Sequence, residues 1–256
     1  MADTDKHWEA WGAQDPYFGV LNSDRFRSDS ISQTRDEFFQ SGEAFISSLL
    51  GQWQRAAGHQ GSHTRALDFG CGVGRLVIPL ARRYAEVVAI DVSASMLQEA
   101  GKNCRAAGFG NVTFVKSDDA LTGLTGSFDF VVSYIVLQHI PPVRGYRMID
   151  RLLTSVGPGG RAMIHVSLRR KLNLRRRTFY FARHRIPFAY YVFNLLQGKP
   201  IRTPLMQMNE YDPVRILEIF ARHGMADVLV TPEIHGDAIR GEIVTARFDA
   251  FRLPND

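Results

Sequence analysis

The stretch "RALDFGCGVGR", residues 65–75, constrains the fold more than any other part of the chain. An apolar run that has the character of a buried strand leads directly into glycines at 70, 72 and 74, and a helical pattern follows. Glycine lets the backbone turn tightly and approach a ligand closely, and a helix N-terminus presents unpaired N–H groups. The stretch therefore predicts a strand, a ligand-binding loop and a helix in an α/β sheet.

The glycine spacing argues against a dinucleotide site. The dinucleotide fingerprint G-x-G-x-x-G/A needs glycine or alanine three residues after its second glycine, and Arg75 occupies that position here. The pattern is instead G-x-G-x-G with Asp68 before it, and a pyrophosphate would sit poorly beside that carboxylate. A nicotinamide oxidoreductase is disfavoured on this ground.

Strand and helix patterns alternate along the middle of the chain, which is typical of a parallel sheet with helical crossovers. We expect strands at 64–69, 86–91, 111–116, 127–134 and 160–168, helices at 74–84, 93–108 and 144–156, and a turn at 157–160. A closing helix at 212–224 and two strands at 226–234 and 241–251 follow. The predicted fold is a doubly wound, Rossmann-like α/β domain with a seven-stranded, mostly parallel sheet and an antiparallel C-terminal hairpin.

We interpret the 256 residues as a single domain with appendages. Its predicted parts are an N-terminal helical lid (1–58, with a helix at 42–58), a cofactor-binding core (59–167), an insertion after strand 5 that caps the acceptor (168–210), and the closing helix and hairpin (211–256). No internal repeat is visible.

Composition narrows the class of protein. The chain is 45% hydrophobic and 22% charged, and no stretch approaches the roughly 20 apolar residues of a membrane-spanning helix. The N-terminus shows no secretion signal, so a cytoplasmic location is expected. Two cysteines, Cys71 and Cys104, are too few for a disulfide framework or a zinc site, and we expect both to be structural.

Acidic residues follow each of the first three predicted strands. Asp68 lies at the end of strand 1, Asp91 ends strand 2, and Asp118 and Asp119 follow strand 3. Because carboxyl ends of parallel strands meet at one edge of a sheet, these carboxylates surround the glycine loop. Such a set suits a ligand with a nucleoside and a cationic, amine-bearing tail. For each aspartate, capping of the next helix or turn is the alternative reading.

Five motifs in register resemble the consecutive motifs of class I S-adenosylmethionine-dependent methyltransferases. They are "ALDFGCGVGRL", "VVAIDVSASMLQEA", "VTFVKSDDA", "SFDFVVSYIVLQHI" and "VGPGGRAMI". The resemblance covers about 64–167, and the closing helix and hairpin agree with that family's seven-stranded sheet.

The resemblance implies a set of cofactor contacts. Gly70, Cys71 and Gly72 would hold the methionine part through the loop backbone, with Asp68 near its ammonium group. Asp91 would bind the ribose with Val92 beside it. The remaining implied contacts are Met96 on the adenine, Asp118 accepting from the adenine amino group, the Asp119 backbone alongside, and Tyr134 lining the cofactor pocket.

The segment after strand 4 is where that family places the acceptor. His139 is the candidate general base, with a core or helix-entry role as the alternative. We expect Gln138 and His139 to wall the acceptor pocket. Tyr17 and Phe18 are further candidates, with plain packing as an equal alternative, and we expect no metal. The absence of an Asn-Pro-Pro-Tyr motif or a Pro-Cys nucleophile leaves a hydroxyl or amine on a small molecule, sugar or lipid-like acceptor. A methyltransferase acting on RNA or protein, and a non-catalytic binding module, are the alternatives.

The net charge of +5 is concentrated in the insertion, in "RRKLNLRRR" at 169–177. Arginines interleaved with aromatic residues over 168–200 have three readings: a helical cap or homodimer contact, a peripheral membrane surface through 168–197, or a groove for single-stranded nucleic acid. The last is the least favoured of the three.

Overall fold

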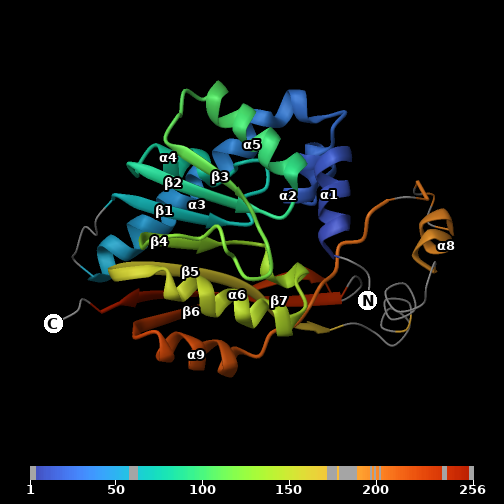
Figure 1. Ribbon diagram of the computed structural model, residues 1–256. Helices are drawn as coiled ribbons and strands as arrows, with labels where there is room; N and C mark the ends of the chain where they lie inside the picture. The colour runs from blue at the N-terminus through green and yellow to red at the C-terminus, as the bar shows by residue number, and fades with distance from the viewer. Residues whose placement is uncertain are drawn as a thin grey trace.

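The computed structural model describes residues 4–57, 63–171, 178, 189–196, 198, 200–201, 203–237 and 241–253. Helices cover both faces of one twisted sheet (Figure 1). The strands are β1 (Arg65–Phe69), β2 (Glu86–Asp91), β3 (Val112–Lys116), β4 (Phe128–Ser133), β5 (Val156–Lys171), β6 (Met225–Asp237) and β7 (Gly241–Arg252).

The sheet order is β3-β2-β1-β4-β5-β7-β6; β7 is antiparallel to both β5 and β6, and the other neighbouring strands pair in parallel. The strand order reverses between β1 and β4, and crevices at such switch points bind ligands in open α/β sheets. The predicted fold class is confirmed.

The two faces of the sheet have separate apolar cores. α3 (Ile31–Ala57), α4 (Val77–Ala81) and α5 (Ala94–Ala106) pack on one face, where Trp53 of α3 meets Phe130 edge-on. On the other face lie α6 (Pro142–Thr154) and α9 (Pro213–Arg222), which pack on Ile164 and Phe248. Strands covered on both faces are near-continuously apolar, as β4 is in this sequence.

The N-terminal elements form a third apolar cluster. α1 (Thr4–Gln14), α2 (Pro16–Val20) and the short helix η1 (Asp24–Phe26) pack through Trp11, Phe18 and Phe26 against Phe38 of α3 and Met96 of α5. α1 contacts α5 and so lies over the core domain (Figure 1).

Several boundaries differ from those expected. The helix expected at 74–84 is only Val77–Ala81, because the glycine loop keeps residues up to Leu76 in turns. The glycines at 157–160 do not separate helix from strand: β5 already begins at Val156, and a register shift against β4 absorbs them. β5 also runs on to Lys171, paired with Glu242 of β7, so the insertion begins later than expected.

Residues 172–177 and 179–188 of the insertion, which include the second half of its arginine run, lie outside the described residues, so the membrane, dimer and nucleic-acid readings remain predictions. The described parts of the insertion include the end of β5 up to Lys171, the helix α8 (Ala189–Leu196) and residues 203–210. Across the described ranges, no helix combines the length and apolar character that crossing a bilayer requires.

Candidate functional site

The glycine loop after β1 is held by backbone hydrogen bonds to the neighbouring strand. The N–H groups of Gly70 and Cys71 both donate to the carbonyl oxygen of Ile90, at 2.7 and 3.0 Å. Gly70 has φ of 78°, and a Cβ added there would lie 2.3 Å from Cγ2 of Val136. Glycine is required at this position for both its backbone conformation and its lack of a side chain.

Asp91, at the end of β2, is oriented by the loop. Its Oδ2 accepts from the N–H of Gly72 and its Oδ1 from the N–H of Ser93, each at 2.9 Å. Burial raises the pKa of Asp91 to about 6, although both backbone hydrogen bonds act in the opposite direction. The carboxylate is therefore fixed at the edge of the cavity and ionised at neutral pH.

Asp68 and Cys71 lie beneath the loop and do not line the cavity. Burial raises the pKa of Asp68 to about 7, against the attraction of Arg75, and its Oδ2 has no hydrogen-bond partner among the described residues. Burial also raises the pKa of the Cys71 thiol well above its ordinary value. Cys71 and Cys104 are both free and buried, in line with the structural role expected of them.

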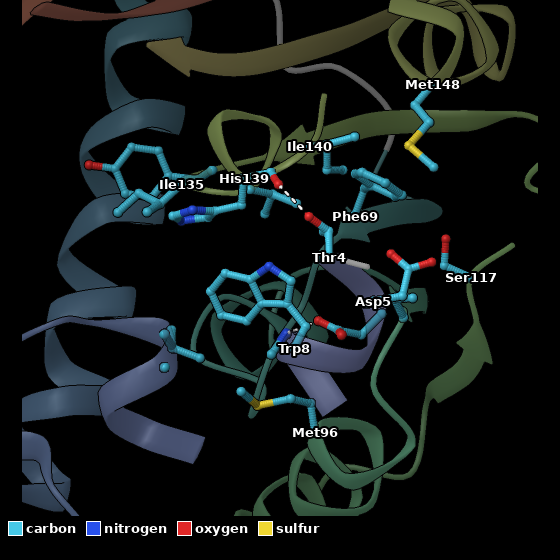
Figure 2. Close-up of a pocket in the computed structure, with 18 of the residues that line it drawn as sticks. Thr4, Asp5, Trp8, Phe69, Met96, Ser117, Ile135, His139, Ile140 and Met148 are labelled. Carbon is cyan, nitrogen blue, oxygen red and sulfur yellow. Dashed lines mark hydrogen bonds between the residues drawn. The ribbon is translucent and has the colours of Figure 1, made fainter. Parts of the chain in front are cut away.

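A cavity opens beside this loop at the switch point of the sheet (Figure 2). Its lining comes from four places: the glycine loop, the end of β2 with α5, the N-terminal helices, and the segment from β4 into α6. The lining residues used below are Thr4, Asp5, Trp8, Val20, Gly70, Gly72, Asp91, Val92, Met96, Ser117, Tyr134, Ile135, Val136, His139, Ile140, Arg144 and Met148.

Of the predicted cofactor contacts, Gly70, Gly72, Asp91, Val92, Met96 and Tyr134 line this one cavity.

Asp118 does not. It is exposed, and its Oδ1 accepts from the backbone N–H groups of Ala120 and Thr122 at 3.1 and 3.0 Å. The carboxylate therefore stabilises the turn that follows it, and Ser117 lines the cavity instead. Asp119 is likewise turned to the surface, where its side chain pairs with Arg144 at 2.7 Å.

His139 lies at the opposite side of the cavity, in the short helix η2 (Leu137–His139). Its Nδ1 is 2.6 Å from the carbonyl oxygen of Gln207, so Nδ1 carries the ring proton and donates it. Burial lowers the pKa of His139 to about 4. The ring of Trp8 packs against it at 4.8 Å between centroids, and Figure 2 shows both rings on the cavity wall. His139 is therefore a neutral imidazole whose Nε2 is a hydrogen-bond acceptor.

The end of the insertion and the residue after it, Asn209 to Tyr211, support η2 from behind. Asn209 donates its backbone N–H to the carbonyl oxygen of Gln138 at 2.6 Å. The hydroxyl of Tyr211 lies 2.9 Å from the carbonyl oxygens of both Leu137 and Ile140. These residues carried no recognisable signal in the sequence, because their partners are backbone groups about 70 positions earlier.

The N-terminal helix α1 is fastened across the cavity. Asp5 makes a two-pronged ion pair with Arg144 of α6, at 2.6 and 2.9 Å. On the other side of the cavity, Glu9 accepts from the hydroxyl of Ser95 at 2.5 Å. The predicted N-terminal lid thus spans the site from α6 to α5.

Three residues predicted for the acceptor pocket lie elsewhere. The hydroxyl of Tyr17 is 2.9 Å from Glu99 and 3.0 Å from Asn103, and its ring is buried against Phe38. Phe18 packs on Trp11 in the same cluster. Burial in the apolar cluster explains the positions of both aromatic rings, and neither ring lines the cavity. Gln138 is buried behind His139, with its Nε2 3.5 Å from Nε2 of the imidazole.

The described residues contain no group of three or more His, Cys, Asp or Glu side chains that could hold a metal ion.

The part of the chain that contains the glycine loop is similar to known proteins. Residues 66–160 match a family model described as a methyltransferase domain. This match identifies residues 66–160 as a methyltransferase domain. Over 108 residues the chain is 36% identical to the ubiquinone biosynthesis O-methyltransferase of Methylocella silvestris, covering 42% of this chain and 41% of that protein.

Two further similarities differ in extent. A segment of 54 residues is 46% identical to the 23S rRNA (uracil(1939)-C(5))-methyltransferase RlmD of Pseudomonas aeruginosa, covering 21% of this chain and 12% of that enzyme. The crystal structure of the magnesium protoporphyrin IX methyltransferase of Synechocystis with bound SAM has the same fold, with a TM-score of 0.57 and 20% identity, covering 98% of each chain. The chain spans less than half the length of the curated relatives named here.

Proposed function

We propose that this protein transfers a methyl group from S-adenosylmethionine to a hydroxyl or amine of a small-molecule, sugar or lipid-like acceptor. The observation that carries the proposal is the composition of the one cavity at the switch point. One of its sides is the glycine loop with Asp91, and the other is an aromatic and apolar wall around a neutral histidine.

The polar side suits the cofactor. Asp91 is an oriented carboxylate that accepts hydrogen bonds, which fits the ribose hydroxyls of a nucleoside. Met96 is 1% exposed and lines the cavity beside Val92, where an adenine ring would pack. Asp68 does not line the cavity, but its buried carboxylate lies beneath the loop with Oδ2 unpartnered, where the ammonium group of the methionine end would attract its charge.

The apolar side suits the acceptor. Trp8, Tyr134, Ile140 and Met148 contribute aromatic and aliphatic surface, and the cation on this wall, Arg144, is already paired with Asp5. Such a wall favours a largely uncharged, flat acceptor over a phosphate backbone. The named O-methyltransferase relative and the magnesium protoporphyrin IX methyltransferase structure agree with a small-molecule acceptor.

The reaction requires the methyl donor and the nucleophile to be aligned. Methyl transfer from a sulfonium is an in-line displacement, so the enzyme must bring donor and nucleophile to about 3 Å and exclude water. α1 covers the cavity and can exclude water. Nε2 of His139 now accepts a 3.5 Å hydrogen bond from the Gln138 amide; it would exchange this contact for the hydrogen bond of the acceptor group and so turn the acceptor's lone pair toward the methyl carbon.

The test uses methyl-labelled S-adenosylmethionine and a cell extract separated into polar metabolites, lipids, protein and nucleic acid. We expect label in the metabolite or lipid fraction. Label found only in nucleic acid or protein would overturn the acceptor class, and binding of the cofactor without transfer to any fraction would favour the non-catalytic module.

A matched pair of variants tests the cofactor side. Asp91→Asn should weaken cofactor binding about tenfold or more, because charge-assisted hydrogen bonds are lost. Asp118→Asn is the same chemical change in an exposed turn and should leave the dissociation constant within about threefold. Equal losses in the two variants would contradict the assignment of Asp91.

A further inference from the structure

Ile135 has a backbone conformation that is unusual for a branched side chain. Its φ is 63°, in the left-handed region where Cβ crowds the backbone. The residue lies between β4 and η2, and it lines the cavity close to His139 in Figure 2. Conformations of this kind persist only where the surroundings enforce them, and they concentrate at functional sites.

His165 of β5 supplies the enforcing contact. Its Nδ1 accepts a hydrogen bond from the backbone N–H of Ile135 at 3.3 Å. Because Nδ1 is the acceptor, the neutral ring carries its proton on Nε2. Burial, with further contributions from His235, Arg247 and His139, lowers the pKa of His165 to about 3. The side chain therefore remains neutral, and Nδ1 remains an acceptor, at any pH near neutrality.

The ring of His165 is itself fixed. It is 2% exposed and meets the ring of Tyr134 edge-on, with 4.9 Å between centroids. β5 lies between β4 and β7, and His165 is directly opposite Arg247 in the antiparallel register. A side chain anchored on an interior strand in this way gives the loop a rigid reference point.

The conformation of Ile135 determines where two cavity walls stand. Its neighbours Tyr134 and Val136 both line the cavity, and Val136 lies directly against Gly70 of the glycine loop. A rotation of the backbone at Ile135 would move the Tyr134 ring, the contact with the glycine loop and the start of η2 together. The conformation of this residue thus bears directly on the gap between the cofactor side and the acceptor side.

We infer that His165 is a positioning residue for methyl transfer, which acts by holding Ile135 in its left-handed conformation. His165 does not line the cavity, so it acts through the loop and not on the acceptor. The catalytic part of this inference rests on the proposed function. The structural part, the hydrogen bond that fixes Ile135, does not.

Three variants separate positioning from general stability. His165→Phe keeps an aromatic ring and removes the acceptor for the Ile135 N–H. His165→Asn restores an acceptor close to the place of Nδ1. The double variant His165→Phe with Ile135→Gly removes the need for enforcement, since glycine adopts positive φ without steric cost. His223→Phe is the control. It removes a partly buried histidine on the opposite face of the sheet, where the ring is hydrogen-bonded to Asp150 at 3.0 Å.

The measurements are kcat, the KM of the acceptor, the Kd of the cofactor and the exchange rate of the Ile135 amide proton. We expect His165→Phe to lower kcat about tenfold, the equivalent of one lost hydrogen bond, with the cofactor Kd changed by about twofold or less. His165→Asn and the double variant should recover most of that loss, and His223→Phe should show none. The Ile135 amide should exchange faster in His165→Phe.

Full activity in His165→Phe would overturn the inference, as would a failure of Ile135→Gly to restore any activity. Parallel loss of cofactor binding would mark His165 as merely structural and overturn it as well. If the unaltered protein transfers no methyl group, the proposed function fails, and the amide exchange alone then decides whether His165 holds Ile135.

Discussion

At His139, the direction of one hydrogen bond limits what the side chain can do. Nδ1 donates to the carbonyl oxygen of Gln207, and burial lowers the pKa of the imidazole to about 4. A base this weak does not carry a proton away at neutral pH, but it accepts a hydrogen bond. The sequence predicted a general base here, and the surroundings make orientation of the acceptor the better description.

His139→Asn tests that description. The asparagine amide can keep the bond to the Gln207 carbonyl, while nothing replaces Nε2. We expect kcat to fall about tenfold, the equivalent of one lost hydrogen bond, with the melting temperature nearly unchanged. His223→Asn is the matched control and should retain activity. Turnover within a few-fold of the unaltered protein would remove His139 from the mechanism.

Among the helices and strands, local sequence patterns predicted the sheet and the glycine loop. They did not predict contacts between residues that lie far apart in the sequence. β2 has the expected bounds, and Ser93 and Asp212 cap α5 and α9 as expected, because strand alternation and capping depend on neighbours in sequence. The support of η2 by Asn209 and Tyr211 depends on tertiary packing across the insertion. For the same reason the sequence did not decide between a pocket wall and plain packing for Tyr17 and Phe18, since aromatic residues suit both equally well.

The lid α1 is an element whose attachment can be loosened separately. Asp5 and Arg144 join it to α6, and their side chains are 37% and 17% exposed. Thr4, Asp5 and Trp8 of this helix line the cavity, so we expect a bound cofactor to leave past α1.

Asp5→Asn weakens this ion pair. We expect dissociation of the cofactor to accelerate a few-fold, with a stability loss of about 1 kcal/mol or less, as for a partly exposed ion pair. Stopped-flow fluorescence of the lid tryptophans would measure the rate. Asp24→Asn breaks an exposed ion pair with Arg27 elsewhere in the N-terminal segment and should change nothing. An unaltered dissociation rate in Asp5→Asn would show that the ion pair does not hold the lid.

For the whole molecule, buried ionisable groups make stability depend on pH in opposing directions. The pKa values of Asp68, Asp91 and Asp249 are raised by burial to about 7, 6 and 6. The folded protein therefore binds more protons than the unfolded chain from about pH 4 up to those values, and stability falls as pH rises through that window. His139 and His165 have lowered pKa values, so they stabilise the fold increasingly as pH rises from about 4 to 6.5.

Asp68→Asn isolates the largest of these contributions, in the protein without cofactor. Near pH 4.5 Asp68 is protonated in the fold, so the variant and the unaltered protein should have similar free energies of unfolding. Near pH 8 the buried carboxylate is ionised with one oxygen unpartnered, so the amide should be more stable, by up to a few kcal/mol. Urea denaturation at both pH values measures this difference, with Asp24→Asn as the exposed control.

Asp68→Asn should also weaken cofactor binding at pH 8, since the charge that costs stability without cofactor is the one that would pair with the ammonium group. A variant that is no more stable than the unaltered protein at pH 8, or that binds the cofactor equally well, would show that the Asp68 carboxylate is not kept for the ligand.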